Sequence, residues 1–241
     1  MSIRLITVLL VAASATACAH RPTYDPADPL EPVNRKIFAF NNTVDRYVAE
    51  PVARTYVKVV PSPVRVGLGN FLDNLSYPVV IVNSLLQLKL AQATHDTGRF
   101  LFNTTVGLAG FLDPASDIGL TANNEDLGQT LGTWGVGEGW YLVLPFLGPT
   151  TNRDLVGRIG DGFTTPLFYL EGPYQNETRI TLLALGILDA RAGLLGSEKL
   201  MAEQFDPYVF LRSAYLERRW NLQHDGNPPV EEIDYDALLA E

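Results

Sequence analysis

Residues 77–88 read YPVVIVNSLLQL and contain no charged side chain before Lys89. A buried strand and a helix both fit so short an apolar run, because its periodicity cannot separate them. The segments on either side of it have helical patterns, so we favour a helix. A helix that is apolar on nearly every side lies in a protein core or faces acyl chains.

The next segment, residues 90–112, reads LAQATHDTGRFLFNTTVGLAGFL and has few charges. It predicts a second long apolar helix, ended by Asp113 and Pro114. Within it, Asp96 and Arg99 are three residues apart, which favours a local salt bridge between them. The neighbouring pair His95 and Asp96 is more typical of a structural contact than of a catalytic dyad.

Upstream, a helical pattern starts at Leu30, where Asp28 can cap a helix whose first residue is Pro29. Apolar residues then recur at steps of four, three and four, at Val33, Ile37, Phe40 and Val44. Asn41 and Asn42 are poor helix formers in this segment, and we expect them to face solvent.

The remaining chain predicts further helices over residues 51–59, 124–133, 152–161, 175–196 and 207–223. We expect Asn124 and Glu125 to open the second of these, and Asp206-Pro207 to open the last. The uncharged segment 140–149 fits no helical period, and its prolines break any long strand, so it predicts a hydrophobic hairpin-like loop. The fold class is therefore all-α with one loop of this kind.

Composition limits the function. The chain has 241 residues, 46% hydrophobic and 19% charged, with a net charge of −9. The charged fraction lies below the roughly 25% of soluble domains, so an unusual share of apolar surface must be covered. The acidic balance argues against binding nucleic acid, which requires a clustered cationic face. A single cysteine excludes cysteine-based zinc sites.

The N-terminus predicts export. Residues 1–17 have a short positive start, an apolar stretch and small residues before Cys18, which is the pattern of a secretory signal peptide. The position of Cys18 resembles a lipobox, whose cysteine thiol takes a diacylglycerol. Ala19, rather than an acidic residue, follows Cys18, and by resemblance to sorted lipoproteins this implies export to the outer membrane rather than retention at the inner membrane. Beyond Cys18 no stretch is long and apolar enough to span a bilayer.

The mature chain divides into three parts. Residues 18–27 form a proline-rich linker from the lipid, residues 28–223 form the helical domain, and residues 224–241 form an acidic flexible tail. No catalytic motif is present: there is no G-x-S-x-G elbow and no H-E-x-x-H, and the run Gly135, Gly137, Gly139 lacks the spacing of a phosphate-binding loop. We expect no enzymatic activity, no metal and no cofactor.

Several ordered segments resemble the MlaA (VacJ) family of phospholipid-transport lipoproteins. They are DPLEPVNRKIFAFNNTVDRYV (28–48), VPSPVRVGLGNFLDNL (60–75), RFLFNTTVGLAGFLDPAS (99–116), EDLGQTLGTWGVGEGWYLVLPFLGPTTNRD (125–154) and FDPYVFLRSAYLERR (205–219). The resemblance implies a compact ring-like bundle of amphipathic and apolar helices, embedded in the periplasmic leaflet of a Gram-negative outer membrane around a central lipid channel.

The resemblance also implies a function and its residues. Such proteins remove misplaced phospholipids from the outer leaflet and pass them to a soluble periplasmic carrier, and they associate with trimeric porins. A glycine-rich loop beside the channel corresponds here to Gly135, Gly137, Gly139, Trp140, Leu144 and Pro145. A helix near the channel corresponds to Asn34, Arg35, Phe40, Asn41 and Asn42.

Two other functions fit parts of the sequence. A structural lipoprotein that packs against an outer-membrane porin without transporting lipid would also have apolar helices. A lipid-modifying enzyme would need a nucleophile or metal site that the sequence does not contain. The first alternative predicts no polar-lined passage, which separates it from lipid transport.

Replacing the lipidated residue tests the anchor. Because acylation requires the thiol, Cys18→Ala should abolish incorporation of labelled palmitate and with it the membrane attachment through lipid. Thr23→Ala in the linker is the matched control and should keep the label. A wild-type chain that takes up no palmitate would contradict the lipobox interpretation.

Overall fold

The computed structural model describes residues 28–229, in which helices and one hairpin are arranged as a ring. The signal peptide, the linker with Cys18 and residues 230–241 of the tail lie outside the described residues. The elements in chain order are α2 (Glu31–Val44), η1 (Asp45–Ala49), α3 (Glu50–Val59), α4 (Ser62–Leu86), α5 (Leu90–Thr105), α6 (Pro114–Asp117), α7 (Leu127–Thr133), β1 (Tyr141–Leu144), β2 (Gly148–Thr151), α8 (Asn152–Thr164), η2 (Pro166–Tyr169), α9 (Gln175–Gly193), α10 (Ser197–Ala202) and α11 (Pro207–Gln223).

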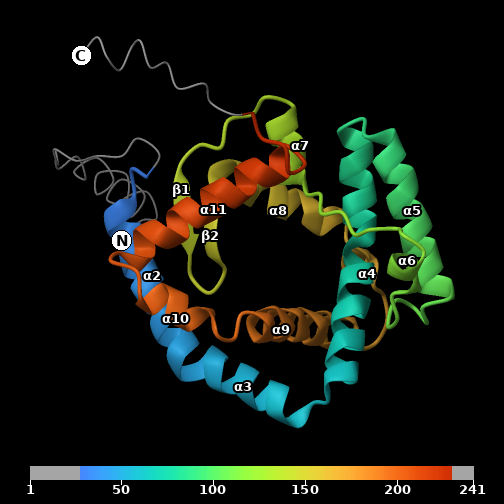
Figure 1. The fold of residues 1–241 in the computed structure, drawn as a ribbon, viewed down its shortest axis with the longest axis horizontal. Helices are drawn as coiled ribbons and strands as arrows, with labels where there is room; N and C mark the ends of the chain where they lie inside the picture. Colours follow the sequence, from blue (N-terminus) through green and yellow to red (C-terminus); the bar gives the residue numbers. More distant parts are fainter. Residues whose placement is uncertain (1–27, 230–241) are drawn as a thin grey trace, which may run out of the picture.

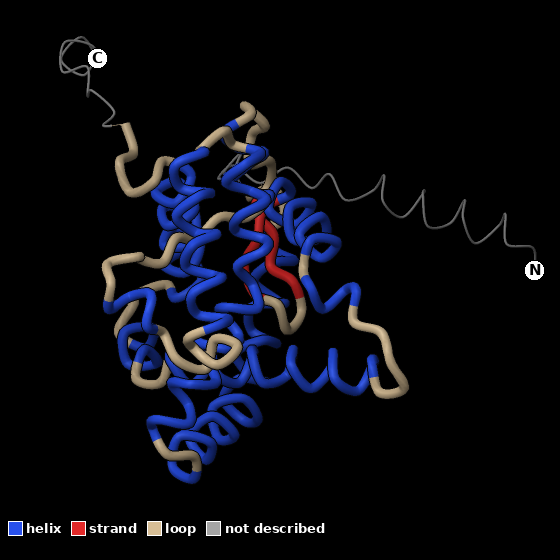
Figure 2. Tube along the Cα trace, turned by 90° about the vertical axis from the view of Figure 1, so that its right-hand side faces the viewer, coloured by secondary structure: helices blue, strands red, loops and turns tan. Residues whose placement is uncertain are grey.

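These elements close on themselves. In Figure 1, α2 and α3 form one side of the ring and α4 the opposite side, while α11 and α7 close it at the top and α9 lies below. The hairpin of β1 and β2 extends toward the middle of this ring, and the side view shows its strands among the helices (Figure 2). The all-α prediction with one hairpin-like segment is confirmed.

The first side of the ring is one continuous helical rod. It begins at Glu31 with Leu30 as the N-cap, so the prediction that Asp28 caps a helix starting at Pro29 is wrong. Pro32 fits in the first turn because a backbone N–H at that position has no carbonyl partner within the helix, so the N–H that proline lacks is not missed. The rod passes into α3 through the π-turn η1, in which the Glu50 N–H donates to the carbonyl of Asp45, five residues earlier. The helix continues although the next residue, Pro51, has no N–H.

The opposite side is the hairpin of α4 and α5. Residues 77–86 form the C-terminal part of α4, so the prediction of a helix for the uncharged segment is confirmed. The helix continues through Pro78. The predicted helix over 90–112 ends earlier, at Thr105. Residues 108–110 have positive φ and reverse the chain. A Cβ on Gly110 would lie 2.4 Å from Asn74 Cβ, so glycine is required where this turn packs on α4.

The interior between α4, α5 and α7 contains polar side chains. Arg99 pairs with Asp113 at 2.7 Å, so the expected Arg99–Asp96 bridge is wrong, and Asp96 instead accepts a hydrogen bond from Asn123. The loop after α5 brings Asp113 back over Arg99. The spacing of residues along a helix cannot predict this contact, because it depends on the path of the loop. His95 lies 3.5 Å from Asp96, in agreement with a structural pair.

At the top of the ring, α7, α8 and α11 are joined by a buried cation. Arg219 contacts Asp126 at 2.6 and 2.9 Å and Asp154 at 2.9 Å. Burial alone would raise the pKa of Asp126, but the hydrogen bonds and charge of Arg219 outweigh it and lower that pKa to about 2. Asp126 also caps α7, so this helix is not opened by Asn124 and Glu125 as expected.

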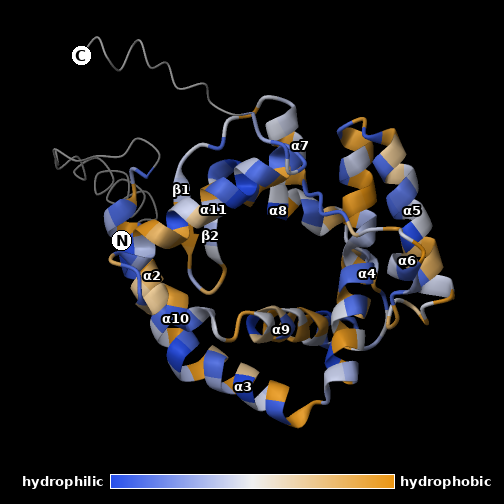
Figure 3. Cartoon of the chain, in the orientation of Figure 1, coloured by the Kyte–Doolittle hydropathy of each residue, from blue (hydrophilic) through white to orange (hydrophobic). Residues whose placement is uncertain are grey.

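Polarity is distributed in an unusual way over the described residues. Buried polar and charged side chains outnumber buried apolar ones within residues 28–229, whereas many large apolar side chains are exposed. The exposed ones include Val59, Leu88, Leu101, Leu108, Ile118 and Ile180. Hydrophobic residues recur along α4, α5 and α9 in Figure 3. Within residues 28–229, no helix combines the length and apolar character that crossing a membrane requires.

Removal of the buried cation tests what holds the top of the ring together. Arg219→Met leaves the buried carboxylate of Asp154 and the partly buried one of Asp126 without this cation, so the free energy of unfolding should fall by about 3 kcal/mol. Arg218→Met, at an exposed neighbour, should change it by less than about 0.5 kcal/mol. Because the folded pKa of Asp126 is lowered from 3.8 to about 2, its contribution is lost as pH falls through this range.

The measurement is denaturant unfolding in detergent at neutral pH and at pH 3, followed by circular dichroism. Equal stability losses in the two variants at neutral pH would show that the buried cation does not support the fold.

Candidate functional site

The hairpin in the ring is short and tightly turned. β1 and β2 pair antiparallel, with Tyr141 opposite Thr151 and Leu144 opposite Gly148. Three residues, 145–147, form the turn, and both Phe146 and Gly148 have positive φ. This agrees with the expected hairpin-like loop over 140–149, with strands of four residues each.

The base and the tip of the hairpin have different surroundings. Tyr141 and Val143 are buried and pack with Tyr208 of α11 in a small apolar cluster. The rings of Tyr141 and Tyr208 meet edge to face, with centroids 6.1 Å apart. The tip is different, since Phe146 is 73% exposed and Leu147 61% exposed. The hairpin therefore has an anchored base and an exposed apolar tip.

The first attachment of β1 is the Asn34 amide on α2. Its Nδ2 donates to the Tyr141 carbonyl at 3.0 Å, and its Oδ1 accepts from the Val143 N–H at 3.0 Å. The same Nδ2 donates to Asp28 at 2.8 Å. Asp28 also accepts from the Tyr208 hydroxyl, so its carboxylate joins α2 to α11, while Asn34 joins α2 to β1.

The second attachment is Asn41, seven residues and two helical turns further along the same face. Its Nδ2 donates to the Leu144 carbonyl at 2.9 Å, and its Oδ1 accepts from the Phe146 N–H at 2.9 Å. The expectation that Asn41 faces solvent is therefore wrong. Each amide pairs with the strand edge as a neighbouring strand would, which satisfies backbone groups that a two-stranded hairpin leaves open.

Arg35 holds a different junction. Its guanidinium forms a two-point contact with Asp206, at 2.7 and 3.1 Å, and lies over the Tyr208 ring at 4.5 Å. The hydrogen bond from Arg35 lowers the pKa of Asp206. Asp206 caps α11, as the sequence predicts, so Arg35 fixes the start of α11 against α2.

The other residues expected on this helix lie at its surface. Phe40 is half exposed and meets Phe146 edge to face, with ring centroids 5.2 Å apart. Asn42 is exposed, and none of the side-chain hydrogen bonds found in residues 28–229 involves it. Trp140 is also exposed, whereas Leu144 is partly buried and Pro145 lies in the turn. The structure thus brings Phe40 and Asn41 to the hairpin and leaves Asn42 outside.

The three alternate glycines have three different surroundings. Gly135 has φ +88° and ends α7, while Gly139 has φ +70° and a Cβ there would lie 3.0 Å from Asn152 Cβ. Gly137 has ordinary φ and open space around its Cβ position. Arg153 donates to the Val136 carbonyl at 3.2 Å, so the loop is attached in the middle as well. A cavity of about 630 Å³ opens beside this loop and α11.

Sequence reasoning missed several residues that organise this site. Asp28, Arg153 and Arg219 contact partners more than ten residues away, and no local spacing indicates those contacts. The spacing of Asn34 and Asn41 is a sequence signal for this contact, because two asparagines seven residues apart lie on one face of a helix and need polar partners or water. Among the described residues, no group of three or more His, Cys, Asp or Glu side chains could hold a metal ion.

Comparison with known proteins supplies the family. A family model described as MlaA lipoprotein matches residues 26–222. The "Intermembrane phospholipid transport system lipoprotein MlaA" of Escherichia coli K12 is 36% identical over 248 residues, covering 98% of this chain and 97% of the relative. The protein of the same name from Haemophilus influenzae is 36% identical, covering 92% and 90%.

A solved structure agrees with the sequence comparison. Described as the structural basis for maintenance of bacterial outer membrane lipid asymmetry, it matches with a TM-score of 0.72 at 34% identity and covers 83% of this chain and 99% of the other. An uncharacterized protein of Rickettsia typhi is 35% identical over 203 residues, which are 83% of this chain and 80% of the relative. With a family match over the described helices and relatives of nearly equal length, the chain belongs to the MlaA lipoprotein family.

Proposed function

We propose that this protein removes misplaced phospholipids from the outer leaflet of the outer membrane and passes them to a soluble periplasmic carrier. The observation that supports this most strongly is the distribution of polarity, with charged networks inside and large apolar side chains exposed outside. A protein surrounded by water favours the opposite distribution. A ring with this surface fits the acyl region of a single leaflet, held there by the Cys18 lipid.

The named relatives support lipid transfer. The relatives from Escherichia coli and Haemophilus influenzae are called phospholipid transport lipoproteins and match nearly the whole of this chain. Transfer of an intact lipid makes and breaks no covalent bond, so this function requires no catalytic group. The trimeric porin and the periplasmic carrier, expected from the family resemblance, belong to this proposal as partners.

The hairpin is the gate in this proposal. A hairpin of two short strands is marginally stable alone, so its position depends on its attachments. The base is fixed by Asn34 and the buried Tyr141, whereas the tip is attached to α2 through Asn41 and the Phe40–Phe146 contact. The tip can therefore leave α2 while the base stays in place. Its apolar side chains would then meet acyl chains moving through the ring.

A charge on the outer apolar surface tests the membrane position. Leu101 on α5 is 55% exposed, so Leu101→Asp should leave the fold intact but reduce partition into the membrane. Asn124→Asp adds the same charge at an exposed polar position and is the matched control. The measurement is membrane flotation of chains whose resistance to protease in detergent is unchanged.

A buried position separates embedding from core packing. Val80 is 8% exposed, so Val80→Asp should unfold the domain even in detergent. Normal flotation of the folded Leu101→Asp variant would contradict a lipid-facing α5.

Release of the hairpin tip tests the gate. Asn41→Leu removes both hydrogen bonds to the tip, so lipid passage should become uncontrolled and cells should become sensitive to detergent plus chelator at normal protein levels. Asn42→Leu changes the adjacent exposed residue and should leave the barrier intact. The measurement is growth with detergent and chelator, with phospholipid in the outer leaflet quantified.

A barrier equally intact in both variants would contradict the gate and would favour a structural lipoprotein that packs against a porin.

A further inference from the structure

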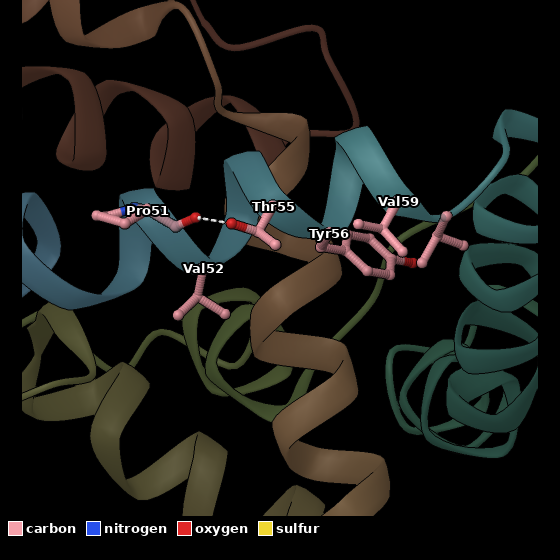
Figure 4. A pocket seen from close by; sticks show the side chains of 6 residues that line it. Pro51, Val52, Thr55, Tyr56 and Val59 are labelled. Atoms are coloured by element: carbon pink, nitrogen blue, oxygen red, sulfur yellow. Dashed lines mark hydrogen bonds between the residues drawn. The ribbon is translucent and has the colours of Figure 1, made fainter.

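An apolar groove runs along α3 at the corner where the chain turns into α4. This groove is open to the outside, has a volume of about 440 Å³ and is lined by Pro51, Val52, Thr55, Tyr56, Val59 and Val60. Figure 4 shows these side chains along one side of the helix, with the Thr55 hydroxyl already bonded to the Pro51 carbonyl. The groove thus offers hydrocarbon surface, and its other side-chain polar group, the Tyr56 hydroxyl, lies near one end.

Charged side chains gather at that end of the groove. The Tyr56 hydroxyl lies 3.4 Å from Asp189 Oδ1 on α9. Arg65 on α4 donates through Nε to the carbonyl of Val60, which itself lines the groove. No other hydrogen bond or ion pair in residues 28–229 uses the guanidinium of Arg65, so its two terminal nitrogens stay available.

The charged residues near the groove follow one another along one face of α4. Arg65, Gly69 and Asp73 are four residues apart, so they follow one another on one face at about 6 Å of helix rise per step. Asp189 lies between the two charged residues, because a Cβ on Gly69 would be 3.1 Å from Asp189 Oδ2. The order along the helix is therefore one cation followed by two carboxylates.

Neither carboxylate has an ion-pair partner within residues 28–229, and Asp73 lies at the surface. Partial desolvation of its carboxyl group and then the charge of Asp189 raise the pKa of Asp73, with Arg99 acting in the opposite direction. Two like charges that repel at one place favour a cation between them.

We propose that this corner binds the head group of a zwitterionic phospholipid with a primary amine. The phosphate contacts Arg65, the ammonium group lies between Asp189 and Asp73, and one acyl chain occupies the groove on α3. A guanidinium followed along one face by two carboxylates matches, in charge and in order, the phosphate and the ammonium of an ethanolamine head group. An anionic lipid meets the same two carboxylates without an ammonium group and is disfavoured.

This inference rests on the proposed function, because it assigns the lipid class that the ring handles. The test incubates the purified full-length protein with vesicles of equal phosphatidylethanolamine and phosphatidylglycerol, reisolates it and quantifies both bound lipids by mass spectrometry. The wild-type protein should retain the two lipids in a ratio about fivefold above that of the vesicles, the size expected of one partly exposed ion pair.

Variants of the carboxylates and of the arginine test the two halves of the head-group site separately. Asp73→Asn with Asp189→Asn should return the ratio to that of the vesicles, whereas Arg65→Gln should lower the retention of both lipids. Asp117→Asn and Arg218→Gln are the controls, since both residues are exposed and belong to α6 and α11. Because Asp73 is exposed, the single variant Asp73→Asn keeps the test valid if the double variant does not fold.

The outcomes distinguish the two proposals. Wild-type protein that binds lipid in the vesicle ratio, or folded Asp73→Asn and double variants that keep the wild-type ratio, would overturn the head-group site and leave lipid transport standing. Wild-type protein that retains no lipid would overturn both.

Discussion

The pairing of two helix asparagines with the edge of β1 is the interaction on which the rest of the site depends. Asn34 and Asn41 each use both atoms of the amide, one as donor and one as acceptor, to complete the strand edge. A four-residue strand with an open edge has little stability of its own. The helix therefore acts as the missing strand and fixes the hairpin inside the ring.

Polar interactions have a large part in this fold because so little apolar surface is buried. Arg219 joins three elements, Arg99 closes the loop after α5, and Arg35 fixes the start of α11. In surroundings of acyl chains, burial of apolar side chains gives little driving force, and close packing and polar contacts must hold helices together. In the position proposed for this protein within one leaflet, the charged interior and the apolar exterior both follow from the surrounding acyl chains.

Sequence patterns predicted those features that depend on neighbours in the chain. The uncharged run 77–88 and the start of α11 at Asp206 follow from composition and capping, and both appear as expected. The apolar character of residues 106–112 predicts a longer α5 than the structure has. The positive φ near Gly110, which ends the helical path, depends on packing against Asn74.

Long-range polar contacts could not be predicted in the same way. The partner of Arg99 is 14 residues away, beyond a loop, and Asn41 bonds residues more than 100 positions later. Each of these contacts depends on the closed ring, which no local period describes. The family resemblance supplied the region of the site, but the distinct surroundings of Gly135, Gly137 and Gly139 required coordinates.

In the proposed gate, lipid passes through the ring only when the hairpin tip leaves α2. A short cross-linker that contains a reducible disulfide, bound to Phe40→Cys and Phe146→Cys, tests this directly, since the side chains at these two positions are in contact. Transfer of labelled phospholipid from proteoliposomes to an acceptor is measured with the same protein cross-linked and then reduced. Transfer should stop in the cross-linked protein and return on reduction, and equal transfer in both states would rule out the gate.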